Sequence, residues 1–563
     1  MNQFRTILLI AWIGVAFLLW QAWQQDHAAP PGAAADPAPT AAPPVIDPAA
    51  IPEPPDAMDP AMAARDAPPA PGADAATGVG AAVVVSTDVL RVEIDPRGGT
   101  VQRADLLRYP DSTQDGAEPV QLLAPAGPGY FVAQSGWVSR SHPAPSHEDA
   151  FTTEGMRHAL AEDAEQVLVP FLWRGDGVEV RRTYVFERGS YAIGVREEVR
   201  NLGPGQWQGS PYRQLQRVPP AGAKRNLLAS PEAFSFVGAA WYSPEHKFNK
   251  LDFDEFLEEP VQATLDRGWV AMLQHYFFAA WIPDPEQQVA VATAQLGGSR
   301  HLIRTVGETV RIGPGESVTR TAQLYVGPKL QDELEDVAPG LGLTIDYGIF
   351  TVLAQPLFWL LSLLHSLLRN WGWAIVALVV LIKLAFFKLS EAQYRSFAKL
   401  RTVQPRIEAL KERYGEDKQK FQQAMIELYR KEKINPAGGC LPILVQIPVF
   451  IALYWVLVES VELRHATWIP GWIDDLTARD PYFILPALNM FAMWATQKLS
   501  PAPGMDPIQR RMMQAMPFVF GIMFAFFPAG LVLYWATNGT LGLLQQWLIM
   551  RRHGVQVRPR PAA

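Results

Sequence analysis

The sequence has 563 residues, a formal net charge of −7 and a single cysteine, Cys440. This length suggests two or more folding units, the negative charge argues against a general nucleic-acid-binding protein, and the lone cysteine excludes an intrachain disulfide and an all-cysteine metal site. Long apolar runs occur between residues 350 and 550 but not between residues 24 and 345, so the two halves of the chain belong to different structural classes.

The first segment of the chain is suited to a membrane. Residues 6–23 carry no charge, and a run of about 18 residues can cross the roughly 30 Å apolar core of a bilayer. A cleaved signal peptide is the alternative, because residues 33–35 are all alanine and offer a cleavage pattern. The tryptophans in the run favour an uncleaved anchor over residues 1–24. Residues 25–80 are rich in Pro and Ala, which predicts an extended linker.

Residues 81–328 predict an all-β domain. Apolar and polar side chains alternate along many short segments, and residues 95–99, Asp-Pro-Arg-Gly-Gly, predict a turn. Residues 178–186 and 191–199 alternate again around a short polar turn and predict a hairpin, with Glu197 on the same face as its apolar neighbours. Many short strands at close spacing indicate a large β-sandwich, which would lie outside the membrane.

After residue 345 the apolar residues recur with the period of a helix. Polar side chains interrupt the leucines of residues 345–369, which predicts an amphipathic helix at the membrane surface. Residues 370–552 predict a core of five membrane spans, and the N-terminal anchor makes six transmembrane helices. The five spans are residues 371–387, 441–458, 482–497, 516–527 and 528–549.

The distribution of charge predicts the orientation of these spans. The loop at residues 391–433 has eleven Lys and Arg against seven Asp and Glu, and the tail at residues 553–563 is also basic. The loop at residues 459–481 has two Arg against five acidic residues. Because basic loops remain on the cytoplasmic side, both termini should be cytoplasmic and the β domain periplasmic.

Polar residues recur at one depth of the predicted spans. Lys383 is the only charged residue between residues 371 and 387, about 18 Å from the periplasmic end at 1.5 Å per residue. A charge there costs at least about 2.5–3.5 kcal/mol, so it should face protein or water. Gln446 enters the next span from the cytoplasmic end, and Thr537 and Asn538 lie about 15 Å along the last span.

This shared depth predicts a wet cavity open to the cytoplasm. A polar or acidic segment of another protein could sit in it while the apolar part enters the lipid, and apolar burial would drive the step without nucleotide or metal. The alternative is that Lys383 extends to the lower interface while the amides bond neighbouring helices.

The basic loop at residues 391–433 predicts a helical hairpin, because apolar residues keep three-four spacing on both sides of Gly415. Its net charge of +4 would suit contact with a ribosome or with anionic membrane lipids, and a solvated loop is the alternative.

The sequence contains no recognisable catalytic, cofactor or metal site. His147, His158 and His275 have no spacing that pairs them with an acid, and His275 is predicted to be part of the core. Phosphate-loop, zinc-protease and serine-hydrolase motifs do not occur. We therefore expect a protein that is not an enzyme and has no cofactor. A small-solute transporter or channel is the alternative function, and a periplasmic sugar-active enzyme is a third, less complete explanation.

Several ordered motifs resemble the YidC/Oxa family of membrane insertases. They are Glu391-Ala392-Gln393-Tyr394 through Leu400-Arg401, Gln404-Pro405, Asn435-Pro436 with Gly438-Gly439-Cys440, Gln446-Ile447-Pro448 with Tyr454, Asp480-Pro481-Tyr482, Gly530 through Trp535, Gln545-Gln546, and residues 87–110 in the β domain. The resemblance implies a polytopic α-helical inner-membrane protein of a Gram-negative-type bacterium, with a periplasmic β-supersandwich that resembles galactose mutarotase. It also implies a membrane protein insertase and folding chaperone.

The resemblance also implies which residues form the family's hydrophilic groove. The family's groove cation falls at Lys383, its glutamine at Gln446, and its aromatic residue at Trp535 beside Tyr534; we add Asn538 from the depth argument. The family's partners are client membrane proteins, SecYEG and SecDF, and its cytoplasmic hairpin lies near the ribosome. The groove cation is usually arginine, so the lysine should retain the attraction for carboxylates but not a two-bond geometry.

Overall fold

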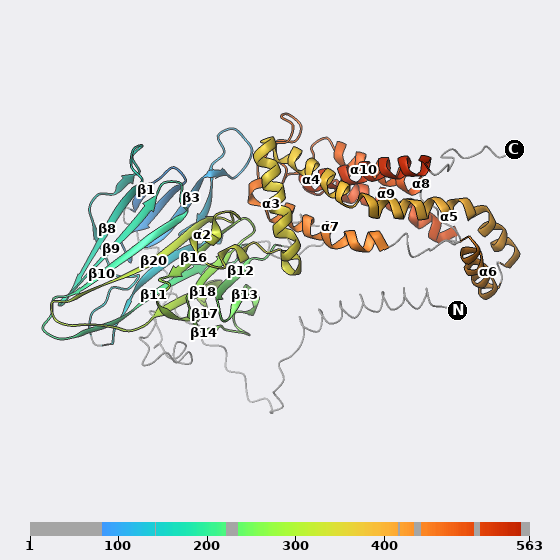
Figure 1. Cartoon of the computed structure of the whole chain (residues 1–563). Helices are drawn as coiled ribbons and strands as arrows, with labels where there is room; N and C mark the ends of the chain where they lie inside the picture. Colours follow the sequence, from blue (N-terminus) through green and yellow to red (C-terminus); the bar gives the residue numbers. More distant parts are fainter. Residues whose placement is uncertain are drawn as a thin grey trace, which may run out of the picture.

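The structure is a computed structural model that describes residues 82–140, 142–220, 235–414, 417–432, 441–499 and 507–552. These residues form a β domain followed by a group of helices (Figure 1). The predicted anchor, linker and C-terminal tail, and Cys440, lie outside the described residues.

The β domain contains two sheets. The first consists of β1 (Val83–Ser86), β2 (Leu90–Asp95), β3 (Thr100–Pro110), β4 (Pro119–Leu123), β5 (Phe131–Val138), β7 (Arg157–Ala159), β11 (Trp207–Arg217), β14 (Gln262–Asp266), β17 (Gln288–Leu296), β18 (Arg300–Gly307) and β19 (Val310–Ile312). Its order is β14-β17-β18-β11-β5-β3-β2-β1-β7, with β19 beside β11 and β4 beside β3. Only β1 and β7 pair in parallel within the described part of this sheet.

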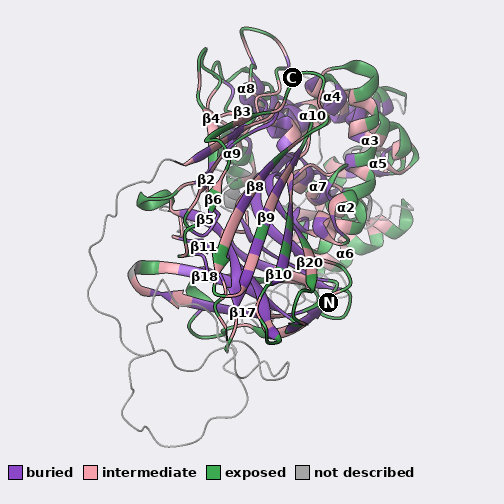
Figure 2. Ribbon diagram, turned by 90° about the vertical axis from the view of Figure 1, so that its left-hand side faces the viewer, coloured by how far each residue is buried: buried purple, intermediate pink, exposed green. Residues whose placement is uncertain are grey.

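The second sheet consists of β6 (Thr152–Thr153), β8 (Gln166–Gly175), β9 (Val178–Glu187), β10 (Ala192–Asn201), β12 (Gly238–Ser243), β13 (Lys247–Asp252), β15 (Trp269–Leu273), β16 (Phe277–Pro283) and β20 (Ser317–Pro328). Its order is β13-β12-β15-β16-β20-β10-β9-β8-β6. Buried residues of both sheets form the core of the domain, and their positions along the strands are coloured purple in Figure 2. The predicted β-sandwich is confirmed.

The predicted hairpin is the antiparallel pair β9–β10, in register with Ile193 opposite Phe186. Glu197 of β10 points into the sandwich and is fully buried. It accepts hydrogen bonds from Arg182 of β9 at 2.8 Å and from Arg213 of β11, in the other sheet, at 3.0 Å. An ion pair therefore joins the two sheets at the centre of the core.

The predicted turn at residues 95–99 lies between β2 and β3. Gly98 has a φ of +74°, and a Cβ at this position would be 2.1 Å from the carbonyl oxygen of His147. Only glycine fits this conformation and this space. Arg182 also donates a hydrogen bond to the Gly98 carbonyl oxygen at 2.6 Å.

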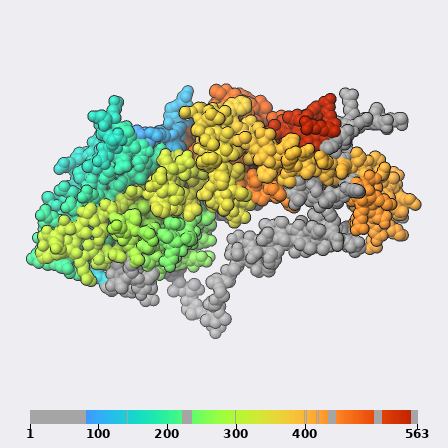
Figure 3. Space-filling model, in the orientation of Figure 1, coloured from blue at the N-terminus to red at the C-terminus, as the bar shows by residue number. Residues whose placement is uncertain are grey.

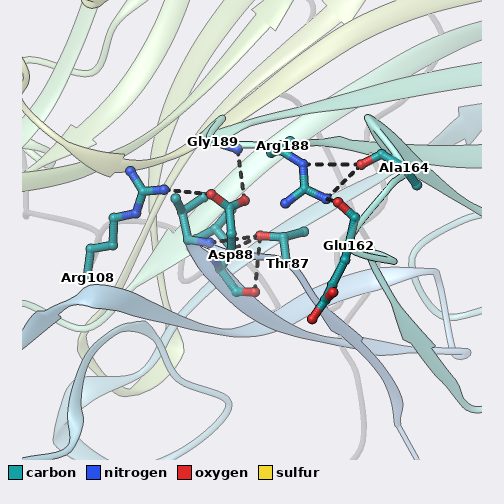
Figure 4. Close-up of polar contacts among 9 residues, drawn as sticks. Thr87, Asp88, Arg108, Glu162, Ala164, Arg188 and Gly189 are labelled. Atoms are coloured by element: carbon teal, nitrogen blue, oxygen red, sulfur yellow. Dashed lines mark hydrogen bonds and ion pairs between the residues drawn. The ribbon is translucent and has the colours of Figure 1, made fainter.

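A second link between the sheets lies near the surface (Figure 4). Asp88, between β1 and β2, accepts hydrogen bonds from Arg108 of β3 at 2.6 Å and from the backbone N–H of Gly189 at 2.8 Å. Gly189 belongs to the turn between β9 and β10, whose Arg188 donates to backbone carbonyl oxygens such as that of Glu162. Asp88 thus holds the hairpin turn of the second sheet against the first.

The remaining described helices are α2 (Leu334–Val337), α3 (Thr351–Leu368), α4 (Trp371–Ala385), α5 (Phe387–Tyr414), α6 (Lys418–Lys431), α7 (Leu441–Glu459), α8 (Ile484–Leu499), α9 (Pro507–Phe524) and α10 (Ala529–Arg552). α10 packs against α8, α4, α5 and α7. α5 and α6 pack through Val403, Ile407 and Phe421. Figure 3 shows α3, in yellow, where the β domain meets the other helices.

The six predicted transmembrane helices are not confirmed by the lengths of these helices. Within the described residues, only residues Gly348–Leu368 form one helical stretch long and apolar enough to cross a membrane. A second span exists if α4 and the first part of α5, which meet at a bend of 67°, are counted together. The stretch that passes the test includes α3, which the sequence predicts to lie along the membrane surface. In Figure 1, α3 runs crosswise to α4, α5 and α7.

Candidate functional site

The candidate site lies where α4, α5, α7 and α10 come together. α4 and α10 both begin at the end of the bundle near the β domain, and α7 ends there. Distances along these helices, at about 1.5 Å per residue, therefore give a common depth scale. Lys383 of α4 is about 18 Å from this end, and Gln446 of α7 and Gly542 of α10 are about 20 Å from it.

Lys383 is partly buried, and its Nζ points toward α10. A Cβ built on Gly542 would lie 3.5 Å from Nζ and 3.6 Å from the hydroxyl oxygen of Tyr394, a residue of α5. Tyr394 donates a hydrogen bond of 3.3 Å to the Gly542 carbonyl oxygen. No described acidic side chain forms an ion pair with Lys383. The lysine therefore lies against protein, with its charge not matched by a neighbouring carboxylate of the described chain.

Gln446 and Asn538 are both partly buried. Asn538 is about 14 Å from the end of the bundle near the β domain, so it lies between Lys383 and that end. Within the described residues, no hydrogen bond joins either amide to Lys383. The structure places the three predicted polar residues at similar depths on three helices without direct contact between them.

Tyr534 and Trp535 belong to an aromatic layer about 8–9 Å from the end near the β domain. The Trp535 ring centroid is 4.1 Å from that of Phe524 in α9 and 5.9 Å from that of Phe450 in α7. The Tyr534 ring is 5.6 Å from that of Phe450. Because these rings come from three helices, the layer fills the bundle between Lys383 and the β domain.

Sequence reasoning missed several residues of this region. In the sequence, Phe450 and Phe524 are ordinary apolar residues of a helix. Only the structure shows that both rings pack against Trp535. Gly542 has no side chain, so the sequence gives no reason to assign it to the site. Tyr394 lies within a motif that resembles the insertase family, and this is the one signal that could have singled it out.

Within the described residues, His147 and His275 of the β domain form no ion pair with a carboxylate. His147 Nδ1 is 2.6 Å from the Tyr212 hydroxyl, and burial lowers the pKa of His147 to about 4. His275 is predicted to be a core residue; its Nε2 lies 2.9 Å from the Val458 carbonyl oxygen, and burial lowers its pKa to about 3. Both rings are therefore neutral at neutral pH. Among the described residues no group of three or more His, Cys, Asp or Glu is arranged to hold a metal ion.

Two family models match the chain. Residues 82–360 match the model described as YidC periplasmic domain, and residues 363–556 match the model described as 60Kd inner membrane protein. Together they cover the β domain and the helices.

Several proteins are similar to this chain over its whole length and share one name. Proteins named membrane protein insertase YidC are 49% identical in Xanthomonas campestris pv. campestris, covering 98% of this chain and 98% of that protein, and 49% identical in Stenotrophomonas maltophilia, covering 100% and 99%. The corresponding protein of Xylella fastidiosa is 46% identical, covering 100% and 99%. The chain therefore belongs to the YidC family, as an inner-membrane protein whose β domain is the family's periplasmic domain.

Proposed function

We propose that this protein inserts transmembrane segments of client proteins into the inner membrane and assists their folding, alone or with the SecYEG translocon and SecDF. It would do so without an enzymatic reaction or a cofactor. Its relatives at 46–49% identity are named as membrane protein insertases. The structural observation that carries the proposal is the position of Lys383, whose ammonium group lies against Gly542 inside the helical bundle.

In this proposal Lys383, Gln446 and Asn538 line a hydrophilic groove open to the cytoplasm, and Tyr534 and Trp535 close it toward the periplasm. A client would place a polar or acidic segment in the groove while its apolar segment enters the lipid. An ammonium and a carboxylate about 4 Å apart attract by on the order of 4 kcal/mol at an effective dielectric constant of 20. This is comparable with the roughly 2.5–3.5 kcal/mol that a charge costs at the centre of a membrane helix.

The order of aromatic and polar residues along the helices supports a groove that is open to the cytoplasm and closed toward the periplasm. The rings of Phe450, Phe524 and Trp535 lie between Lys383 and the β domain. A client's polar segment that reaches Lys383 from the cytoplasm would then have to cross only the aromatic layer and the periplasmic ends of the helices. The hydrocarbon path for that segment would become shorter by the depth of the groove.

We further propose six transmembrane helices with both termini in the cytoplasm, and α3 along the periplasmic surface of the membrane. The basic and acidic loops support this orientation. The side chains of Val352, Trp359 and Leu367 in α3 are exposed by 81%, 66% and 77%, as expected for an apolar face turned to lipid. Cysteines introduced at residues 419 and 471 should react with a membrane-impermeant reagent from the cytoplasmic and the periplasmic side, respectively, and the reverse pattern would reject this orientation.

The helical hairpin α5–α6 and the C-terminal tail would face the cytoplasm, where their basic side chains could contact a ribosome or anionic membrane lipids. We propose no specific binding of nucleic acid beyond such a contact.

The proposed function can be tested with purified protein in liposomes. A labelled two-span client should insert without nucleotide, and crosslinkers at residues 446 and 535 should capture it. Lys383→Arg should support insertion, Lys383→Ala should reduce it, and Lys383→Glu should reduce it most for clients with an acidic translocated segment. Equal insertion by the wild type and Lys383→Glu would reject the charge attraction. Flux of a small solute without client insertion would instead support a transporter.

A further inference from the structure

We propose that Gly542 and Tyr394 are positioning residues that hold the Lys383 ammonium group toward the substrate. This inference rests on the proposed function, because it assigns the two residues to the same groove. Gly542 would provide the space that the end of the lysine side chain occupies, and Tyr394 would provide a hydroxyl beside it.

Three helices converge on one point at Gly542. The Lys383 Nζ, from α4, and the Tyr394 hydroxyl oxygen, from α5, lie 3.5 Å and 3.6 Å from the position that a Cβ of Gly542 would take. The same hydroxyl donates a hydrogen bond to the Gly542 carbonyl oxygen. A phenol hydroxyl that donates one hydrogen bond can still accept another, so it can accept one from an ammonium group or from a water at this point.

The backbone does not require glycine at this position. Gly542 lies within α10 and is absent from the residues with positive φ. Glycine in a helix interior is less favourable than alanine, so its presence needs a reason outside the helix itself. The space occupied by Lys383 and Tyr394 is such a reason. Close helix packing is the competing explanation.

The size of the side chain at residue 542 separates these explanations. Alanine would place its Cβ in ordinary van der Waals contact with both polar groups, so it should fold and disturb Lys383 little. The γ-carbons of valine would extend into the space of the ammonium or the hydroxyl. Gly542→Val should therefore move the charge while leaving the rest of α10 in place.

Gly539 provides a matched control on the same helix. A Cβ there would meet the Ala492 Cβ at 3.4 Å and the Asn489 Oδ1 at 3.5 Å, both in α8, and not Lys383. Gly539→Ala and Gly542→Ala therefore make the same change at similar contact distances, but against different neighbouring helices.

The experiment measures insertion by the full-length protein in liposomes, with two clients that differ only in an acidic or a neutral translocated segment. Gly542→Val should lower insertion of the acidic client by about tenfold, which corresponds to loss of one hydrogen bond to a charged group. Insertion of the neutral client should change little. Tyr394→Phe should lower insertion of the acidic client by a smaller factor. Gly542→Ala and Gly539→Ala should both change insertion little, and Gly539→Val, the control of matched size, should not distinguish the acidic from the neutral client.

A double-mutant cycle with Lys383→Met tests whether the effect acts through the lysine. Gly542→Val should cause no additional loss for the acidic client in the Lys383→Met protein. An equal loss in both backgrounds, or an equal loss for both clients, would show that Gly542 serves helix packing, and would overturn the inference. If Lys383→Met itself has no effect on the acidic client, the proposed groove function fails instead. Thermal unfolding of each variant shows whether it is folded.

Discussion

Ser235 of the β domain and Glu459, the last residue of α7, are joined by a hydrogen bond of 3.2 Å. Further hydrogen bonds join Gln331 to Ser460 at 3.2 Å and Arg464 to the Pro110 carbonyl oxygen at 2.6 Å. The β domain is thus attached to the helices by specific polar contacts at the end of α7, in addition to the chain connection through α3. We name this set of contacts, at residues 458–464, the junction.

The junction should be weaker at neutral pH than in mild acid. Glu462 accepts a hydrogen bond of 3.3 Å from the Gln331 backbone N–H. Burial, together with the nearby Asp332 and Glu333, raises the pKa of Glu462 to about 7. A carboxyl group whose pKa is raised in the docked state favours docking when it is protonated. This contribution is therefore lost as the pH rises through about 7.

Glu462→Gln keeps an acceptor for the Gln331 N–H and removes the charge. Docking in the wild type should weaken as the pH rises from about 5 to about 7. It should weaken less in this variant, where Glu459, whose pKa burial also raises to about 7, still titrates. Spin-label distances between the β domain and α8 in full-length protein measure the docking. Glu286→Gln, at an exposed turn far from the junction, is the control. An unchanged pH dependence in Glu462→Gln would exclude this residue as the cause.

Glu197→Gln should strongly destabilise the β domain. Glu197 is fully buried and accepts hydrogen bonds from Arg182 and Arg213. Replacing its carboxylate with a neutral amide leaves two buried guanidinium groups without an anion. Removing one partner of a buried ion pair costs about 3–5 kcal/mol. Urea unfolding followed by circular dichroism measures the change. Glu198→Gln, exposed on the opposite face of the same strand, should cost far less.

The sequence predicts the fold well where local pattern decides it. Alternation predicts β9 and β10 and places Glu197 toward the core, because side chains of a strand alternate between its faces. It does not predict that Arg213 in another sheet meets Glu197, because that contact depends on how two sheets stack. The turn at residues 95–99 is predictable from its glycines, but the carbonyl oxygen of His147 beside Gly98 is not.

The candidate site is predictable to a smaller extent. Lys383 stands out because a charge in an apolar run is costly, and counting residues gives its depth. Which helix it faces depends on rotation and packing, so the sequence alone does not indicate Gly542 or Tyr394. The aromatic layer is hidden for the same reason, because apolar rings such as that of Phe450 are normal in any membrane helix.

Asp88→Asn should reduce stability by less than about 1 kcal/mol at neutral pH, because the ion pair with Arg108 is near the surface. Burial acts to raise the pKa of Asp88, but hydrogen bonding from Gly189 and the Arg108 charge outweigh it and lower the pKa below its usual value. A lowered carboxyl pKa contributes stability at neutral pH that is lost as the pH falls through the folded-state value. The wild type and Asp88→Asn should therefore become equally stable in acid. Thermal unfolding at several pH values measures this, and a constant difference would contradict it.

Trp535→Ala should make the bundle permeable. The Trp535 ring is in contact range of Phe450, Phe524 and Phe527, so its removal leaves a void in the layer between Lys383 and the β domain. Trp→Ala changes in a packed core cost about 3–5 kcal/mol, while Trp535→Phe should cost less because it keeps one ring in place. Liposomes that contain Trp535→Ala should leak a small entrapped ion, and those with Trp535→Phe should leak less.

Trp547→Ala is the matched control, since Trp547 lies on the same helix, is 36% exposed and stacks on Arg551 instead of the aromatic layer. If the aromatic layer is the barrier on the periplasmic side, liposomes with Trp535→Ala should leak and those with Trp547→Ala should not. The leak should appear without any client. Equal leaks from both variants would mean that α10 is generally disturbed. A tight membrane with Trp535→Ala, in protein shown to be folded, would place the barrier elsewhere in the bundle.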